Sequence, residues 1–428
     1  MFALLIYRIV LLLFLPLVLL ALLFRSISNP QYRQRLSERL GFIPKPYKKN
    51  GIIVHAASVG EVIALTPFIE QLLQTYPQLP ITLTTFTPTG SAQVKKQFSS
   101  RVQHCFLPLD ILPCTQVFLT RLQPKLMIFM ETELWPNLIN QCAKKQIKLL
   151  LINGRLSAKS MKNYKKISPL ITPTLNRFDK ILCQSQDNLT NFIQLGANNE
   201  HCFVSGNLKF DISINTNILD KQAQLTKLLP KHRQLWLVAS THPGDEKIAL
   251  TAFKQVKTLF PTLLLVLVPR HPERFNSVEK LCSSDGFSLV KRSENTPIES
   301  QDIWLLDTLG ELMAAYSLAD IVTMGGSFSQ IGGHNPLEPA LFKKPIIVGS
   351  DMSNFTEVLK QLKQLQGIIQ LPVSYTSTGQ ASQLAEMVIK LLQDTPKAAL
   401  LGKQAHQVVM NNQGASDRTM SQVQELIS

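Results

Sequence analysis

The 428-residue chain is too long for one ordinary hydrophobic core, and we expect two domains of roughly 150 to 200 residues each. Hydrophobic residues make up 45% of the chain and charged residues only 17%, which disfavours a disordered protein and indicates a globular, partly membrane-associated one. The six scattered cysteines form no Cys-x-x-Cys pair and have no histidines at zinc spacing, so we interpret them as buried thiols in a reducing compartment.

The net charge of +15 lies in the first half of the chain. Residues 1–210 hold 24 Lys and Arg against 9 Asp and Glu, whereas residues 211–428 hold 20 of each. A basic surface attracts anionic lipids, acidic substrates or nucleic acid, although it also serves solubility alone. Because aromatic residues are not interleaved with the basic ones as in a known nucleic-acid-binding module, we expect no nucleic acid partner.

The first 24 residues form an apolar segment that is interrupted by Arg8 and Pro16. As a helix it would reach about 36 Å, enough to cross the roughly 30 Å hydrocarbon core if Arg8 snorkels to the surface. No small-residue cleavage site follows, so we expect a retained transmembrane signal anchor and not a cleaved signal peptide. The arginines after it place the rest of the chain in the cytoplasm, while full spanning of the bilayer is left open.

From residue 51, short β-branched runs alternate with longer amphipathic stretches, which predicts βαβ units around parallel sheets. The first series of expected strands comprises Gly51–His55, Ile81–Thr85, Leu126–Met130, Lys148–Ile152 and Lys180–Cys183. The second comprises Leu235–Ala239, Leu263–Val268, Ile303–Leu306, Ile321–Met324 and Pro345–Val348.

The predicted organisation has four parts. They are a membrane anchor at 1–24, a Rossmann-like domain at 25–210, a polar linker at 211–231 and a second Rossmann-like domain at 232–428. We expect the two domains to face a cleft. The last helix of the tail is a candidate for packing back on the first domain.

Polar loops follow several expected strands, at the edge where ligands gather in open α/β sheets. Glu61 follows the first strand in the first turn of a helix, either as a general base or as a glutamate favoured by the helix dipole. Glu131 and Glu133, two apart in an extended chain, project to one face, as a metal pair or as acids ahead of a helix that starts at Pro136. The loops at 153–157 and 206–211 each supply one cation, Arg155 and Lys209.

The second half offers two anion-binding loops after strands, at 240–246 and 268–274. Arg270 suits bidentate contact to a phosphate, although a salt bridge between the domains would explain one such arginine. The most specific segment is Gly325–Ala340, a glycine-rich loop that lets backbone amides approach a phosphate, with Glu338 placed to accept from ribose hydroxyls. Hydride-transfer and ATPase functions are excluded, because the chain lacks Gly-x-Gly-x-x-Gly after the first strand and any Gly-Lys-Ser/Thr loop.

Together these motifs resemble the Kdo (3-deoxy-D-manno-octulosonic acid) transferases of lipopolysaccharide assembly, which are glycosyltransferases with the GT-B fold. The resemblance covers nearly the whole chain. Besides the N-terminal anchor, the segments that show the resemblance are His55–Glu61, Glu131–Asn137, Asn153–Ser157, Gly206–Asp211, Ser240–Glu246, Pro269–Phe275 and Gly325–Ala340.

The resemblance implies CMP-Kdo as donor, the lipid A precursor lipid IVA as acceptor, and attachment to anionic lipids of the cell inner membrane. It implies Glu61 as the proton acceptor, with Glu131 and Lys209 stabilising the transition state, and neither a cofactor nor a metal. The CMP-binding residues that it implies are Pro269, Arg270, Leu309, Gly310, Glu311, Asn335, Pro336, Leu337 and Glu338.

Two alternatives stay open from the residues alone. Another GT-B enzyme of the envelope with a UDP-sugar donor would use the same fold and the same ribose-binding glutamate, and donor competition would separate the two. A membrane-tethered nucleotide-binding regulator without turnover would use the same glycine loop. The number of Kdo residues transferred, the acylation of the acceptor and the oligomeric state are not specified by these motifs.

Overall fold

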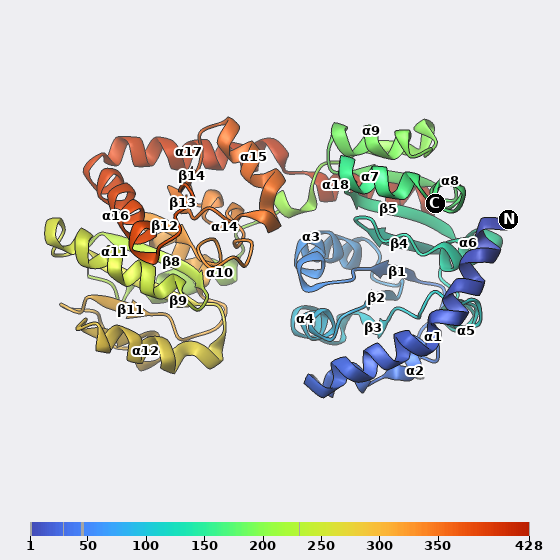
Figure 1. Ribbon diagram of the computed structural model, residues 1–428, viewed down its shortest axis with the longest axis horizontal. Coiled ribbons are helices and arrows are strands. Elements are labelled where there is room, and N and C mark those ends of the chain that lie inside the picture. Colours follow the sequence, from blue (N-terminus) through green and yellow to red (C-terminus); the bar gives the residue numbers. More distant parts are fainter. Residues whose placement is uncertain (1, 29, 44–46, 231, 428) are drawn as a thin grey trace. The chain divides into compact units, whose positions relative to one another are not determined.

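The computed structural model describes residues 2–28, 30–43, 47–230 and 232–427, and its elements are labelled in Figure 1. The chain forms two compact units by its internal contacts: Met1–Asp211 with Asn412–Ser428, called the first unit, and Ile212–Asn411, called the second unit. Each unit contains one seven-stranded sheet. Both predicted Rossmann-like sheets and the N-terminal apolar helix are therefore confirmed.

The sheet of the first unit has the strand order β3-β2-β1-β4-β5-β6-β7, and all its neighbouring pairs are parallel. Its strands are β1 Ile52–His55, β2 Ile81–Thr85, β3 Gln103–Phe106, β4 Leu126–Met130, β5 Lys148–Gly154, β6 Lys180–Cys183 and β7 Cys202–Val204. Its helices are α1 Phe2–Ser28, α2 Leu36–Arg39, α3 Val59–Thr75, α4 Pro88–Phe98, α5 Leu112–Leu122, α6 Pro136–Lys144, α7 Ala158–Lys165, α8 Ser168–Leu175, α9 Gln186–Gln194 and α18 Ala415–Ile427.

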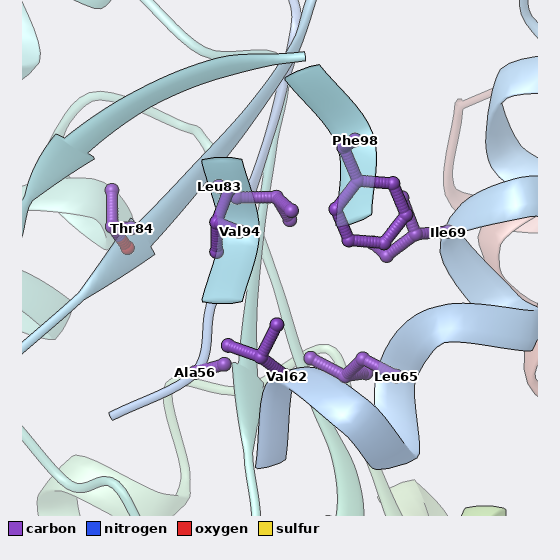
Figure 2. Close-up of a pocket in the computed structure, with 8 residues that line it drawn as sticks. All are labelled: Ala56, Val62, Leu65, Ile69, Leu83, Thr84, Val94 and Phe98. Carbon is purple, nitrogen blue, oxygen red and sulfur yellow. The ribbon is translucent and has the colours of Figure 1, made fainter. Parts of the chain in front are cut away.

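Two hydrophobic cores lie on the faces of this sheet, which is why its central strands are apolar along their whole length. One core joins the sheet to α3, α4 and α18, and the other joins it to α5, α6, α8 and α9. Figure 2 shows a small pocket in the first core, lined by hydrophobic side chains and Thr84. Three of these side chains, Val62, Leu65 and Ile69, belong to α3, the helix that carries Glu61, and they face side chains of β2 and α4.

The last helix, α18, belongs to the first unit. The Asp211 carboxylate accepts from the backbone N–H of Gly414 at 2.7 Å and of Ser416 at 2.5 Å at the start of α18. The Arg418 Nε donates to the Ser205 carbonyl at 2.7 Å. An acidic cap and a buried apolar face thus hold the C-terminal helix on the first sheet.

The segment predicted as a linker, 211–231, is not an open connection. It contains helix α10, Thr216–Thr226, which packs on α13 in the second unit. The second unit starts at Ile212 and not at residue 232. Met1, Lys231 and Ser428, at the ends of three predicted segments, lie outside the described residues.

The sheet of the second unit has the order β10-β11-β9-β8-β12-β13-β14, again with parallel pairs. Its strands are β8 Leu235–Thr241, β9 Leu264–Pro269, β10 Leu289–Lys291, β11 Ile303–Leu305, β12 Ile321–Met324, β13 Ile346–Val348 and β14 Ile369–Gln370. Its helices are α10, α11 Asp245–Leu259, α12 Phe275–Ser284, α13 Leu312–Leu318, α14 Leu337–Leu341, α15 Thr356–Gln364, α16 Ser377–Gln393 and α17 Thr395–Asn412.

Within the described part of the chain, one helix is long and apolar enough to cross a membrane, Phe2–Ile27, with a mean hydropathy of 2.7. All six cysteines are buried and carry free thiols, as predicted.

Candidate active site

Glu61 lies in the first turn of α3, just beyond the carboxyl end of β1. The Ser58 hydroxyl donates to Glu61 Oε1 at 2.8 Å, and the Ala57 N–H donates to Oε2 at 2.9 Å. This is a capping box, in which the third helical residue reaches back to the start of its own helix. Burial raises the pKa of Glu61, and the negative charges of Glu131 and Glu133 raise it further. The two hydrogen bonds lower this pKa but do not cancel the rise. A carboxylate of raised pKa takes up a proton more readily, as a general base must.

The acid loop, Glu131–Trp135, follows β4, the neighbour of β1 in the sheet. Glu131 adopts φ +58, a left-handed conformation that is strained for a glutamate, and its N–H bonds the Ile152 carbonyl of β5. The loop is therefore not extended at Glu131, which is the conformation on which the predicted same-face arrangement of its two acids rested.

The two acids of this loop have different partners. The Glu131 Oε1 lies 4.0 Å from Lys209 Nζ, whereas Glu133 Oε2 accepts from the Trp135 indole at 2.9 Å and lies 3.6 Å from His55 Nε2. Burial alone would raise the pKa of Glu133, but His55 and the Trp135 bond outweigh burial and lower it. Glu133 therefore stays ionised beside β1, while Glu131 faces the cation of another loop.

Lys209 lies in a short 3₁₀ turn, Leu208–Phe210, after the last strand of the first sheet. The Asn207 side chain accepts from the Lys209 N–H at 3.0 Å, and the buried Asn153 Oδ1 accepts from the Leu208 N–H at 3.0 Å. Gly206 precedes them at φ +92, where a side chain would be strained. Two asparagines and one glycine thus fix the loop that presents Lys209 to Glu131.

In the second unit, Pro269 ends β9 and Arg270 follows, with its N–H bonded to the Thr241 carbonyl at the bulged end of β8. The glycine-rich loop runs against the same strand end. A Cβ on Gly325 would come within 2.6 Å of the Ser240 carbonyl oxygen, so only glycine allows this approach. Arg270, which follows β9, and the glycine-rich loop, which follows β12, therefore both contact the carboxyl end of β8, the strand between them.

Glu338 lies half-buried in α14, a helix of only 5 residues. Burial raises its pKa to about 7, against the lowering effect of Asn335, Arg270 and Tyr316. The Asn335 side chain holds this turn, since its Oδ1 accepts from the Leu337 N–H at 3.2 Å and its Nδ2 lies 3.4 Å from Glu338 Oε1. The arrangement offers one carboxylate and one arginine to a ribose phosphate.

The predicted turn Leu309–Glu311 lies just ahead of α13. Leu309 is exposed, and Gly310 adopts φ +83 with its carbonyl accepting from Lys221 Nζ at 2.9 Å. The Glu311 carboxylate is buried and accepts from the Arg292 guanidinium at 3.0 Å and from the Thr308 hydroxyl. Glu311 therefore braces the turn from inside, which leaves the turn's backbone and Leu309 to meet a ligand.

Comparison with known proteins shows the family of the chain. The family model for 3-deoxy-D-manno-octulosonic-acid transferase (kdotransferase) matches residues 34–212. The 3-deoxy-D-manno-octulosonic acid transferase of Haemophilus influenzae is 42% identical over 411 residues, which cover 95% of this chain and 94% of that protein. The chain belongs to the Kdo transferase family. It is thus a glycosyltransferase.

Two solved structures are similar to this Kdo transferase. One is the C-terminal CMP-Kdo binding domain of WaaA from Acinetobacter baumannii. The superposition covers 46% of this chain and 99% of the WaaA domain, with 29% identity and a TM-score of 0.42. The other is the UDP-GlcNAc 2-epimerase of Neisseria meningitidis bound to UDP-GlcNAc. The superposition covers 89% of this chain and 100% of the epimerase chain, with 14% identity and a TM-score of 0.58. The second likeness concerns the fold alone, and with it the predicted GT-B fold class is confirmed.

Sequence reasoning singled out no histidine of this transferase, yet three lie together in the second unit. The His242 and His334 rings stack with their Nε2 atoms 2.9 Å apart, and the His271 ring lies edge-on to His242. Burial, followed by the charge of Arg270, lowers the pKa of His334 to about 4, so its ring is neutral at pH 7. A signal was present, since three of the chain's eight histidines fall in the three predicted nucleotide loops.

Proposed function

We propose that the protein transfers Kdo from CMP-Kdo to a hydroxyl group of the lipid A precursor lipid IVA, in lipopolysaccharide biosynthesis. The observation that carries the proposal is the half-buried Glu61, of raised pKa, next to a Lys209–Glu131 pair at the sheet edge of a Kdo transferase family member. A UDP-sugar donor is not favoured, because relatives that are 42% and 39% identical to this chain are named 3-deoxy-D-manno-octulosonic acid transferases.

In this mechanism Glu61 takes the proton from the acceptor hydroxyl. The acceptor oxygen forms a bond to the anomeric carbon of Kdo as the bond from that carbon to the CMP phosphate oxygen breaks, and CMP leaves with the electron pair. Arg270 stabilises the negative charge on the leaving phosphate, and Lys209 with Glu131 stabilises the transition state. The ribose of CMP is held by Glu338 and Asn335, and by the backbone of residues 309–311 and 335–338.

We propose that no metal takes part. The leaving group is a monophosphate, whose developing negative charge an arginine can stabilise by bidentate contact. The two glutamates of the acid loop have other partners: Lys209 for Glu131, and His55 with Trp135 for Glu133.

Transfer is therefore expected to persist in excess EDTA. Mass spectrometry of the lipid product formed from CMP-Kdo and a tetra-acylated, bisphosphorylated precursor measures both the activity and the number of Kdo residues added. Loss of product in EDTA with recovery on adding magnesium would overturn metal independence and make Glu131 and Glu133 candidate ligands. A product from UDP-sugars and none from CMP-Kdo would overturn the proposed donor.

The donor residues make distinguishable contributions to nucleotide affinity, which calorimetry with CMP and with cytidine measures. Arg270→Ala should weaken CMP about tenfold to a hundredfold, as for one charge-assisted hydrogen bond, and leave cytidine unchanged because cytidine has no phosphate. Glu338→Gln should weaken both ligands, because ribose is common to them. Lys254→Ala is the matched control and should leave both affinities unchanged, because Lys254 is an exposed residue of α11 that pairs with Asp285. Unchanged CMP affinity in both test variants would mean that the nucleotide binds elsewhere.

We further propose that the protein is attached to the cytoplasmic face of the inner membrane. The apolar helix Phe2–Ile27 supplies a lipid-binding segment, and residues 1–210, with their net charge of +15, supply attraction to anionic lipids.

A further inference from the structure

Helix α1, which is part of the first unit, is held against the rest of that unit by two polar contacts near its start. The Tyr7 hydroxyl donates to Asp110 Oδ2 at 2.8 Å, and Arg8 Nε donates to Asn137 Oδ1 at 2.8 Å. About two turns further on, Leu15 packs on a small core in the segment that leads into α5. Figure 1 shows α1 running beside α5 and α6. We call Tyr7, Arg8, Asp110 and Asn137 the clamp.

The clamp is built into the start of α6. Asp110 and Asn137 are both buried, and Asp110 accepts from the N–H groups of Asn137 at 2.9 Å and Leu138 at 2.8 Å. Asn137 Nδ2 in turn donates to the Asp110 carbonyl at 2.6 Å. A carboxylate at a helix N-terminus is stabilised by the free N–H groups and the helix dipole. Asp110 therefore holds its position without α1, and α1 docks on a preformed site.

The remaining sides of α1 present large apolar side chains to the surroundings. Leu5 is 52% exposed, Leu12 56% and Leu20 54%. An exposed apolar surface of this length is not stable in water, and the basic first unit beside it favours anionic lipid as the covering phase.

These contacts decide between two orientations of the helix. A helix that spans the bilayer is surrounded by lipid or other spans, and Arg8 and Tyr7 would lie inside the hydrocarbon or at its far surface. Here both turn to Asp110 and Asn137, and Leu15 meets the first unit as well. The folded unit would have to enter the hydrocarbon to keep these contacts around a spanning helix.

We infer that α1 is an in-plane anchor, clamped along one side to the first unit by Tyr7–Asp110 and Arg8–Asn137, with its other sides in the outer acyl region of one leaflet. This inference rests on the proposed membrane attachment. Asn137 of the clamp lies only two residues after Trp135, the last residue of the acid loop. The clamp therefore also sets the height of Glu131 and Glu133 relative to the lipid surface.

Spin-label depth measurements on the full-length protein in vesicles of zwitterionic and anionic phospholipid test the orientation. Single cysteines at Leu5, Leu12 and Leu20, which are about equally exposed and lie on neighbouring sides of the helix, carry the label, because the six native thiols are buried. An in-plane helix places all three labels at a similar shallow depth, about 5 to 10 Å below the headgroups. A spanning helix places Leu12 near the bilayer centre, about 15 Å deep, with the others shallower, and this result would overturn the inference.

The clamp itself is tested with the double variant Tyr7→Phe, Arg8→Met, which removes both polar contacts but leaves the Asp110 cap of α6 intact. The three depths should then diverge, because the helix is freed from the unit and has lost its charge. Arg25→Met, which removes a cation of α1 outside the clamp, should keep them alike. Equal depths in the double variant would show that the clamp does not hold the helix. Failure of the wild-type protein to sediment with vesicles would instead refute membrane attachment itself.

Discussion

Replacing Glu61 with glutamine is expected to lower turnover by about 10² or more, with little change in melting temperature or CMP affinity. Glutamine keeps the size of the side chain and an oxygen that accepts from Ser58 or Ala57, so the capping box survives. It cannot take up the proton of the acceptor hydroxyl. The variant therefore loses an interaction that is made in the transition state. This loss is measured as a lower kcat at saturating donor and acceptor.

The capping box gives Glu61 a structural role, and the same variant separates that role from catalysis. If Glu61 only capped α3, glutamine would serve nearly as well, and turnover would stay near normal. Glu70→Gln on the same helix, which removes an exposed partner of Arg101, is the matched control and should leave kcat unchanged. Near-normal turnover of the Glu61 variant would transfer the role of base to another acid, with Glu131 the first to test.

The pH dependence of stability gives an independent check on Glu61. Burial raises its pKa in the folded chain, so the folded state binds this proton more tightly than the unfolded state does. Its contribution to stability is therefore present below the unfolded pKa and is lost as the pH rises through the folded pKa. The glutamine variant does not titrate at this position and lacks the loss. The difference between its melting temperature and that of the wild type should therefore increase from pH 4 to pH 8.

The strands that sequence reasoning identified are the central ones. All four that it missed, β3, β7, β10 and β14, are the outer strands of the two sheets. A central strand in a parallel sheet is covered on both faces and reads as a continuous apolar run, as in Leu126–Met130. An edge strand is short and partly exposed, as Cys202–Val204 is, and its sequence carries little signal.

The site shows a similar division. Residues that follow a strand, such as Glu61, Glu131 and Arg270, could be placed at the carboxyl edge from the sequence, because strand ends are local features. Their partners could not be placed. The Glu133–His55 contact depends on which strands are neighbours, and the left-handed conformation of Glu131 is imposed by the fold and not by its own preference.

The linker prediction failed for a related reason. Residues 211–231 are polar and were predicted to be a linker, but they include α10, which buries Leu225 and packs on α13. A helix that buries so few residues has little hydrophobic periodicity, so composition alone suggests a loop.

Replacing Lys209 with methionine is expected to lower kcat by about 10² to 10³, as for loss of one preorganised charge at a reacting centre. Methionine keeps much of the length and apolar stem of lysine but removes the cation that faces Glu131 at 4.0 Å. Arginine at the same position should restore part of the activity, since it returns the charge with a different geometry. The measurement is kcat with CMP-Kdo and lipid acceptor at saturation, beside a thermal melt.

Lys148→Met is the matched control for this experiment. Lys148 begins β5 at the opposite end of the same sheet and pairs with Asp179 at 3.0 Å, so its loss should cost little turnover. A structural role for Lys209 predicts a lower melting temperature with kcat nearly intact, because its ion pair with Glu131 would then stabilise the fold and not the transition state. A catalytic role predicts the reverse, a near-normal melt and a loss of turnover that arginine partly repairs. Equal kcat in the Lys209 and Lys148 variants would remove Lys209 from the mechanism.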